Sequence, residues 1–219
     1  MRLVQASIGY HQSMPILQGI DMELPSSQLV ALVGRNGSGK STLLRTMAGL
    51  QPLLAGSIIG ERPAIVLTAT PDLQHTTVRQ MAAYGRLPYT GFLGKLHPSD
   101  YEQADLALAT LGISHMSQQL FCQLSDGEKQ KVMIASALVQ GATTLLLDEP
   151  SAFLDYPSRL QLMELLRDLA HTQGKSILIS THDLELTQKY ADQFWLIRDR
   201  QLFTSSATDS IDIMGEISK

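Results

Sequence analysis

The stretch that decides the fold is Gly34-Arg35-Asn36-Gly37-Ser38-Gly39-Lys40-Ser41-Thr42. It follows the apolar run of residues 29–33 and opens a helical pattern of apolar residues that continues to residue 50. A strand, a glycine-rich loop and a helix in this order are the context in which G-x-x-x-x-G-K-[ST] forms a phosphate-binding loop. This context argues against the alternative, a glycine turn that matches by chance. We therefore predict that the chain binds a nucleotide.

The residue types of this loop suit a phosphate ligand. Gly34, Gly37 and Gly39 lie where a side chain would keep the backbone away from a phosphate, so the first N–H groups of the helix can face the anion. Lys40 can reach the β- and γ-phosphates, and the Ser41 hydroxyl can ligate Mg²⁺. The predicted nucleotide-binding set is completed by Asn36, Ser38 and Thr42.

Length and composition indicate one globular domain. The chain has 219 residues, of which 44% are hydrophobic and 17% charged, which suits a soluble protein with a sizeable core. A net charge of -4 gives no broad basic surface for nucleic acid. No apolar run approaches the ~20 residues of a membrane span, and residues 1–10 lack the apolar core of a signal peptide. The single cysteine, Cys122, excludes an internal disulfide and is expected to be a small buried residue.

The first seventy residues read as short strands. Alternating residues predict a strand near residues 3–10, and residues 16–24 form a second candidate; their short connection requires antiparallel pairing. Two more short strands are expected at residues 57–60 and 64–67. Tyr10 ends the first strand, where an aromatic ring either stacks on an adenine or simply occupies a turn; spacing alone does not choose between them.

A helical insertion is expected next. Residues 76–85 begin helically, with Thr76 or Thr77 as the N-cap. Residues 86–98 are rich in Gly, Pro and aromatics and predict a loop. Ser99 and Glu102 form a capping-box pattern for a helix over residues 99–111. We interpret this region as a helical insertion into an α/β core.

The sequence Leu-Ser-Asp-Gly-Glu at residues 124–128 precedes an apolar-periodic helix. It therefore marks a helix N-terminus, a second place where backbone N–H groups and a hydroxyl can meet phosphate. The motif alone is a weak signal for phosphate binding, because an ordinary helix N-cap has the same sequence features.

Acidic residues and a histidine follow two further predicted strands. Residues 143–147 form a continuous apolar run, typical of a central parallel strand, and end in Asp148 and Glu149. Groups just beyond strand ends reach the ligand in open α/β sheets. We predict that Asp148 holds Mg²⁺ and that Glu149 orients and activates a water. His182 follows the strand predicted at residues 175–180, at the same sheet edge, and is a candidate for a catalytic contact.

The remaining elements complete an alternation of helices and strands. The expected helices cover residues 157–170 and 183–190, and closing strands are expected at residues 193–197 and 201–204. Residues 205–219 form a polar tail.

With these motifs in this order, the chain resembles the nucleotide-binding subunit of ATP-binding cassette (ABC) transporters over about residues 1–204. The resemblance implies an α/β fold: a P-loop NTPase core with a mainly parallel sheet, an N-terminal antiparallel β subdomain and an inserted α-helical subdomain. It implies a single ABC ATP-binding domain over residues 1–219. Its core and antiparallel part would occupy residues 1–70 and 141–204, and its helical subdomain about residues 71–140.

The resemblance also implies roles for individual residues. Two copies would form a homodimer in the ATP-bound state, each ATP lying between one copy's P-loop and the signature motif, residues 124–128, of the other. Ser125 and Gly127 would then contact the γ-phosphate in trans. Mg²⁺ would be held by Ser41 and Asp148. The implied catalytic residues are Lys40, Glu149 and the switch histidine His182, and the implied ATP contacts include Tyr10 and Asp155, the latter in the D-loop at residues 151–155.

Three departures from the family pattern stand out. Asp126 replaces the usual first glycine of the signature, and Glu128 replaces its usual glutamine. Residues 65–71 lack the glutamine that usually joins the core to the helical subdomain, and Thr68 or Thr70 offers only a shorter hydroxyl. Residues 56–67 are also shorter than usual, so the antiparallel part is expected to be trimmed.

Residues 84–94 and 152–155 resemble the ATPases of importers for iron–siderophore, haem and cobalamin. This implies an integral membrane permease and a separate substrate-binding protein as partners, no nucleic acid partner, and a peripheral location at the cytoplasmic face of the inner membrane. The alternatives are a soluble ABC ATPase of the iron–sulfur assembly, repair or translation type, and a binder that does not hydrolyse ATP. The soluble ABC ATPase lacks support because the sequence shows no long coiled-coil insertion and no second cassette. The non-hydrolysing binder is disfavoured because Glu149 and His182 are both present.

Overall fold

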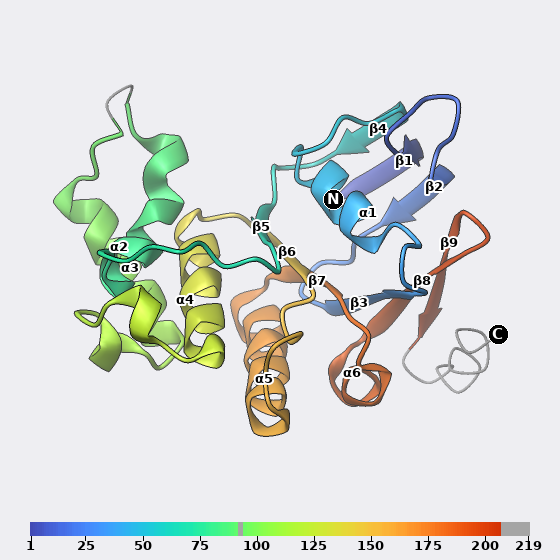
Figure 1. Ribbon diagram of the computed structural model, residues 1–219. Coiled ribbons are helices and arrows are strands. Elements are labelled where there is room, and N and C mark those ends of the chain that lie inside the picture. The colour runs from blue at the N-terminus through green and yellow to red at the C-terminus, as the bar shows by residue number, and fades with distance from the viewer. Residues whose placement is uncertain (92–93, 207–219) are drawn as a thin grey trace.

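The computed structural model describes residues 1–91 and 94–206. Its N-terminal part contains a three-stranded antiparallel sheet in the order β2-β1-β4, seen at the upper right of Figure 1. The strands are β1 (Arg2–Ile8), β2 (Leu17–Glu23) and β4 (Ala55–Ile59). The antiparallel pairing predicted for the first two strands is confirmed.

The second sheet carries the sequence motifs. Its order is β5-β6-β7-β3-β8-β9, parallel except for the β8–β9 hairpin. Every residue of β3, β6 and β7 is buried, which explains their continuous apolar runs. The strands are β3 (Leu29–Gly34), β5 (Ala64–Val66), β6 (Thr144–Asp148), β7 (Ser176–Ser180), β8 (Gln193–Arg198) and β9 (Gln201–Ser206). Because β6, β7 and β3 are parallel neighbours, the loops that follow them leave the same edge of the sheet.

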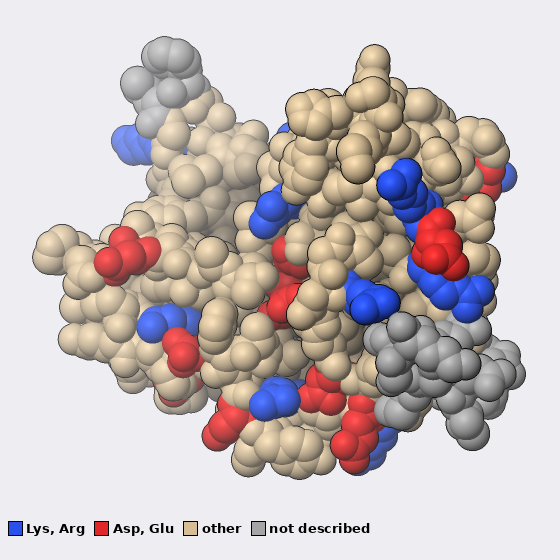
Figure 2. Space-filling view, turned by 45° about the vertical axis from the view of Figure 1, so that its right-hand side comes forward, with Lys and Arg blue, Asp and Glu red and all other residues tan. Residues whose placement is uncertain are grey.

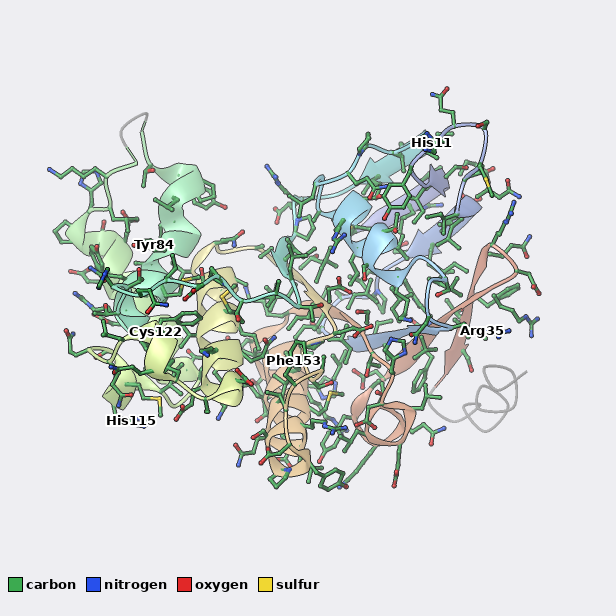
Figure 3. All side chains as sticks on the ribbon, viewed as in Figure 1. His11, Arg35, Tyr84, His115, Cys122 and Phe153 are labelled. Atoms are coloured by element: carbon green, nitrogen blue, oxygen red, sulfur yellow. The ribbon has the colours of Figure 1, made fainter. Side chains whose placement is uncertain are left out.

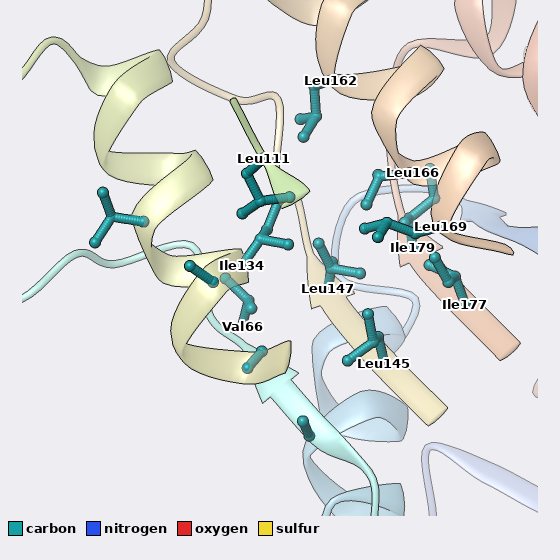
Figure 4. Packing of buried hydrophobic residues seen from close by; sticks show 14 of the residues in the cluster. Val66, Leu111, Ile134, Leu145, Leu147, Leu162, Leu166, Leu169, Ile177 and Ile179 are labelled. Atoms are coloured by element: carbon teal, nitrogen blue, oxygen red, sulfur yellow. The ribbon is translucent and has the colours of Figure 1, made fainter. Parts of the chain in front are cut away.

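The P-loop strand β3 separates two apolar cores. Val30 and Leu32 face a core that also contains Leu43 and Leu44 of helix α1 (Lys40–Met47) and residues of both sheets. Alternate β3 residues face the second core, which joins the sheet to the helices beyond it. Figure 4 shows this second core, where Leu145 and Leu147 of β6 lie beside leucines of α5 (Tyr156–Gln173). The alternation along one strand therefore fixes α1 on one face and α5 on the other.

The helices of residues 77–139 gather on one side of the sheet in Figure 1. Thr77 caps α2 and exchanges hydrogen bonds with Gln80, so one of the two expected N-caps is confirmed. The helical elements are α2 (Val78–Ala83), the 3₁₀ helix η1 (Tyr84–Tyr89), α3 (Pro98–Thr110), the short 3₁₀ turns η2 (Ser114–Met116) and η3 (Phe121–Gln123), and α4 (Asp126–Val139).

Two local predictions in this region are wrong. Residues 86–89 belong to the 3₁₀ helix η1 rather than to a loop. The reason is tertiary packing: Gly85 of η1 packs so closely on α4 that an added Cβ would lie 1.9 Å from the Ser136 carbonyl oxygen. The Ser99–Glu102 capping box is also wrong. The helix begins one residue earlier, at Pro98, because proline suits a first helical position, and Asp100 accepts the His97 backbone N–H at 2.9 Å. Phe92 and Leu93, part of the segment that resembles importer ATPases, lie outside the described residues.

The C-terminal elements extend the predicted ones slightly. Helix α5 runs to Gln173 and ends at Gly174, whose φ of 68° is the left-handed conformation that terminates helices. It is followed by α6 (Leu184–Tyr190). Of the predicted polar tail, residues 205–206 belong to β9 and residues 207–219 lie outside the described part of the chain. Among the described residues, no helix is long and apolar enough to cross a membrane.

Candidate functional site

The P-loop is held open by its glycines. Gly37 and Gly39 have φ values of 76° and 106°, and a Cβ on Gly39 would lie 2.5 Å from Ile16 Cγ2. Helix α1 begins directly after Gly39, and no side chain caps its first turn. The loop therefore presents backbone N–H groups at a helix N-terminus, as an anion site requires.

Lys40 lies across the P-loop. Its Nζ donates to the Gly34 carbonyl at 2.8 Å and to the Arg35 carbonyl at 3.3 Å. Burial lowers the pKa of its ammonium group, while the nearby Glu149 and Asp148 carboxylates act in the opposite direction. The ammonium is thus held over the loop by carbonyl oxygens, which a phosphate can replace as the stronger acceptor.

Asp148 is the centre of a buried hydrogen-bond cluster. Its side chain is at the end of β6 and only 2% exposed. Its Oδ1 accepts hydrogen bonds from Ser41 Oγ at 2.9 Å and from Ser180 Oγ at 2.8 Å. The structure thus brings together Ser41 and Asp148, the two residues predicted to hold Mg²⁺, although they are 107 residues apart in sequence.

Glu149 is fixed by its backbone and by its side chain. Its φ of 47° is unusual for a residue with a side chain, and its N–H donates to Ser180 Oγ at 2.8 Å. His182 Nε2 lies 2.6 Å from Glu149 Oε1. The two candidate catalytic side chains therefore contact each other, and His182 lies at the sheet edge where the sequence placed it.

The P-loop and the acidic cluster fit a nucleotide phosphate with Mg²⁺. Ser38 Oγ is buried in the loop and makes no hydrogen bond to other described protein atoms. An added Cβ on Gly37 would meet nothing within 4 Å, so this part of the loop faces open space. A hydroxyl and a carboxylate are oxygen ligands of the kind that Mg²⁺ prefers, and Ser41 and Asp148 supply both.

A large pocket adjoins the P-loop. It has a volume of about 860 Å³, within the usual range for ligand sites. Its wall includes Tyr10, Arg35, Gly37 and Arg198. Tyr10 is 65% exposed, and its hydroxyl lies 3.3 Å from Thr42 Oγ1. Figure 3 shows Arg35 and His11, which also lines the pocket, on the side of the molecule away from helices α2, α3 and α4.

The signature residues form the first turn of α4. Ser125 is its N-cap, and its hydroxyl donates to Glu128 Oε2 at 2.7 Å. This hydrogen bond lowers the pKa of the Glu128 carboxyl. A Cβ on Gly127 would lie 3.4 Å from Ser158 Oγ in α5. Asp155 caps α5 by accepting the Ser158 N–H at 3.0 Å.

The structure does not bring the signature residues to the P-loop of the same chain. Ser125 and Gly127 are at one end of α4, which packs on α2, α3 and β5, whereas α1 packs on β1, β3 and β6. In Figure 1 the strands β5 and β6 lie between α4 and α1. The N-terminus of α4 thus contributes nothing to its own P-loop.

The family model described as "ABC transporter" matches residues 17–152 of this chain. The chain belongs to the ABC transporter family. A second model, described as "AAA domain, putative AbiEii toxin, Type IV TA system", matches the shorter stretch of residues 119–187. As an ATP-binding domain of this family, the chain binds ATP and is an ATPase.

Named relatives of this ABC ATPase take part in transport. It is 34% identical to the "Achromobactin transport ATP-binding protein CbrD" of Dickeya dadantii, over 94% of this chain and 82% of that protein. It is 32% identical to the "Iron(3+)-hydroxamate import ATP-binding protein FhuC" of Bacillus subtilis, over 85% of this chain and 74% of that protein.

A solved structure confirms the fold of this ABC ATPase. The structure described as an inward-facing conformation of a putative metal-chelate type ABC transporter superposes with a TM-score of 0.90, at 24% identity. The match covers 99% of this chain and 88% of that one. The predicted fold class is therefore confirmed, including the parallel sheet and the antiparallel sheet.

Sequence reasoning missed several residues around the site of this ABC ATPase. Ser180 bridges Asp148 and Glu149, yet in the sequence it is only the last residue of an apolar strand, two residues before His182, and no role was predicted for it. Arg159 joins two loops: Nε donates to the Leu154 carbonyl at 2.9 Å and Nη1 to Asp183 Oδ2 at 3.1 Å. The pairing of β6 with β7 would have indicated Ser180, but nothing in the sequence indicated Arg159.

Cys122 lies away from the site, among the helices with His115 in Figure 3. It is half-buried rather than fully buried, with Sγ 3.6 Å from the Gln74 carbonyl oxygen, because it lies in the middle of the short 3₁₀ turn η3 and not in a core helix. On the face shown in Figure 2, Lys and Arg side chains are interspersed with Asp and Glu.

Proposed function

We propose that this ABC ATPase is the ATP-hydrolysing subunit of an importer that moves an iron chelate (a siderophore or haem) or cobalamin through a membrane permease. The names of the relatives support this substrate class. Besides the two proteins described above, a "Cobalamin import ATP-binding protein BtuD" of Halobacterium salinarum is 34% identical over 90% of this chain and 52% of that protein. The proposal that ATP is hydrolysed at this site rests on the contact between Glu149 and His182, which lies beside the Ser41–Asp148 pair.

In the proposed reaction, Lys40 and the N–H groups of the P-loop bind the ATP phosphates. Ser41 and Asp148 would hold Mg²⁺, which supplies positive charge that stabilises the transferring phosphoryl group. Glu149 orients the attacking water and accepts its proton, and His182 keeps the Glu149 carboxylate in place. Tyr10 is the candidate for stacking on the adenine, since it lines the pocket next to the P-loop.

We propose further that ATP binding produces a head-to-tail homodimer. The position of Ser125 and Gly127, away from their own P-loop, supports a role for them in trans, with Asp155 at the same interface. Before hydrolysis, the γ-phosphate contact joins the two copies. After hydrolysis, the products repel each other, so the dimer switches from a closed to an open state.

The permease is proposed to dock on the helical side, at η1. Leu87 and Tyr89 are 42% and 61% exposed there, and Arg86 stacks on the Tyr89 ring at 4.5 Å. Such a fixed apolar surface is typical of interaction sites. It would place the chain peripherally at the cytoplasmic face of the membrane, with a separate substrate-binding protein on the other side.

The importer proposal is tested by purifying the tagged chain in mild detergent from membranes of the cells that naturally produce it. We expect a polytopic permease to co-purify with wild type and with Leu106→Asp, a matched control because Leu106 is 62% exposed on α3. Leu87→Asp should lose the permease while still binding ATP. Recovery of the chain in the soluble fraction without a permease would favour the soluble ABC ATPase instead.

A further inference from the structure

The amide of Gln130 is a buried polar group to which the reaction above gives no role. Gln130 lies on α4 with 7% of its surface exposed, and its Nε2 makes no hydrogen bond to any protein atom that the structure describes. Leaving a buried amide N–H without a partner is costly, because the group loses the hydrogen bonds it makes to water in the unfolded chain. The Gln130 amide therefore calls for a hydrogen-bond partner that the described residues do not provide.

Gln130 lines a small pocket directly beside the candidate catalytic residue. The pocket has a volume of about 100 Å³, and its wall also includes Glu149, Thr68 and Thr70. A water occupies about 30 Å³ in the liquid and needs two to four polar partners when buried. The pocket thus has room for about three waters, and the carboxylate and hydroxyls on its wall can bind them.

The same pocket is bounded by the segment that lacks the family's usual glutamine. Thr68 is already engaged there: its hydroxyl donates to the Asp148 carbonyl at 2.8 Å, so it holds the backbone before Glu149 and not the Glu149 carboxylate. Ala69, next along the wall, has no polar side-chain atom. Among the described residues of the wall, Gln130 alone carries an amide.

We propose that Gln130 is a positioning residue for ATP hydrolysis. Its Nε2 donates to a water in this pocket, and that water donates to the Glu149 carboxylate. His182 holds the same carboxylate through Oε1 at 2.6 Å. Glu149 is thus fixed by the core and also by the signature helix. The proposal rests on the proposed role of Glu149 but not on transport.

The test replaces Gln130 by Met, which keeps the length of the side chain and removes the amide. We expect kcat for ATP hydrolysis to fall about tenfold, which is less than the ~100-fold cost of a misplacement of about 1 Å, because His182 still holds Glu149. KM for ATP should stay within about twofold and the thermal unfolding midpoint should be unchanged. Gln103→Met, on an exposed position of α3, is the matched control and should behave like wild type.

A second-site variant separates positioning from packing. Ala69→Gln in the Gln130→Met background returns an amide to the pocket from another residue of its wall, so kcat should recover. A purely structural role of Gln130 would show as a lower unfolding midpoint with no recovery, and that result would overturn the proposal.

Crystallography gives a readout independent of turnover. A structure at about 1.5 Å resolution should show a water within hydrogen-bond distance of both Gln130 Nε2 and the Glu149 carboxylate. Its absence refutes the proposal. If Glu149→Gln hydrolyses ATP normally, the proposed catalytic role of Glu149 fails. If Glu149→Gln is inactive while Gln130→Met keeps the wild-type kcat, only the positioning role fails.

Discussion

Ser180 is expected to determine both the stability of the site and its activity. It is fully buried, it donates to the Asp148 carboxylate at 2.8 Å, and it accepts the Glu149 N–H at 2.8 Å. Ser180→Ala removes a hydrogen bond to a charged group, which contributes about 1.5–3 kcal/mol, and a neutral one, which contributes about 1 kcal/mol. The free energy of unfolding should therefore fall by about 2.5–4 kcal/mol. At about 2–4 °C per kcal/mol for a chain of this size, the unfolding midpoint should fall by about 5–15 °C.

The assay is urea unfolding followed by circular dichroism, together with phosphate release. Ser176→Ala is the matched control, because Ser176 is buried on the same strand and takes no part in the cluster around Asp148. We expect the control to change stability by less than about 1 kcal/mol. For Ser180→Ala we also expect a lower kcat, since the unusual backbone conformation of Glu149 loses its hydrogen-bond partner. Equal stability losses in the two variants would refute the reasoning.

Three other variants probe the remaining parts of the site and the fold. Lys40→Ala should lose nucleotide binding, measured by titration calorimetry, because the Lys40 ammonium is the group that spans the Gly34 and Arg35 carbonyls of the P-loop; normal binding would contradict the phosphate assignment. Glu149→Gln should bind ATP, hydrolyse it at most about a hundredth as fast, and form a dimer in light scattering; a chain that stays monomeric with saturating ATP would count against the homodimer. The His97 N–H and Arg86 hold the pKa of Asp100 below its usual 3.8, so its stabilising effect is present above pH 3.8 and is lost as pH falls below that value. Asp100→Asn should accordingly unfold at lower urea concentration than wild type at pH 7, and this difference should shrink in acid; a difference independent of pH would exclude the ionised form as its cause.

Sequence reasoning succeeded where a residue type and its place after a strand coincide. Asp148 ends a buried apolar strand and Lys40 and His182 follow two others, and parallel neighbours end at one sheet edge, so the convergence of these residues followed from the sequence pattern. Thr77 could be predicted as a helix N-cap candidate because N-cap chemistry depends only on residues nearby in the sequence. Both kinds of prediction need no knowledge of which distant residues pack together.

Tertiary packing decided the features that the sequence did not reveal. The 3₁₀ helix η1 depends on the close approach of Gly85 to Ser136, two residues from separate helices. Gln130 sits within a polar stretch of α4 and looks like an exposed residue in sequence; only the folded chain buries its amide beside Glu149. Periodicity describes one element at a time and cannot report contacts of this kind.

The hydrogen bonds of Ser125 show what Glu128, which replaces the usual glutamine of the signature, does in the single chain. Both its N–H and its hydroxyl donate to Glu128 Oε2, at 2.8 and 2.7 Å, and these bonds keep the pKa of that carboxyl below its usual value, so it is ionised near neutral pH. Ser125 is thus already paired with an anion in the single chain. Because a charge-assisted hydrogen bond is about twice as strong as a neutral one, a neutral acceptor would not displace Glu128. A partner's γ-phosphate carries the charge to do so, and this makes the proposed contact in trans an exchange of one anion for another, dependent on the triphosphate being intact.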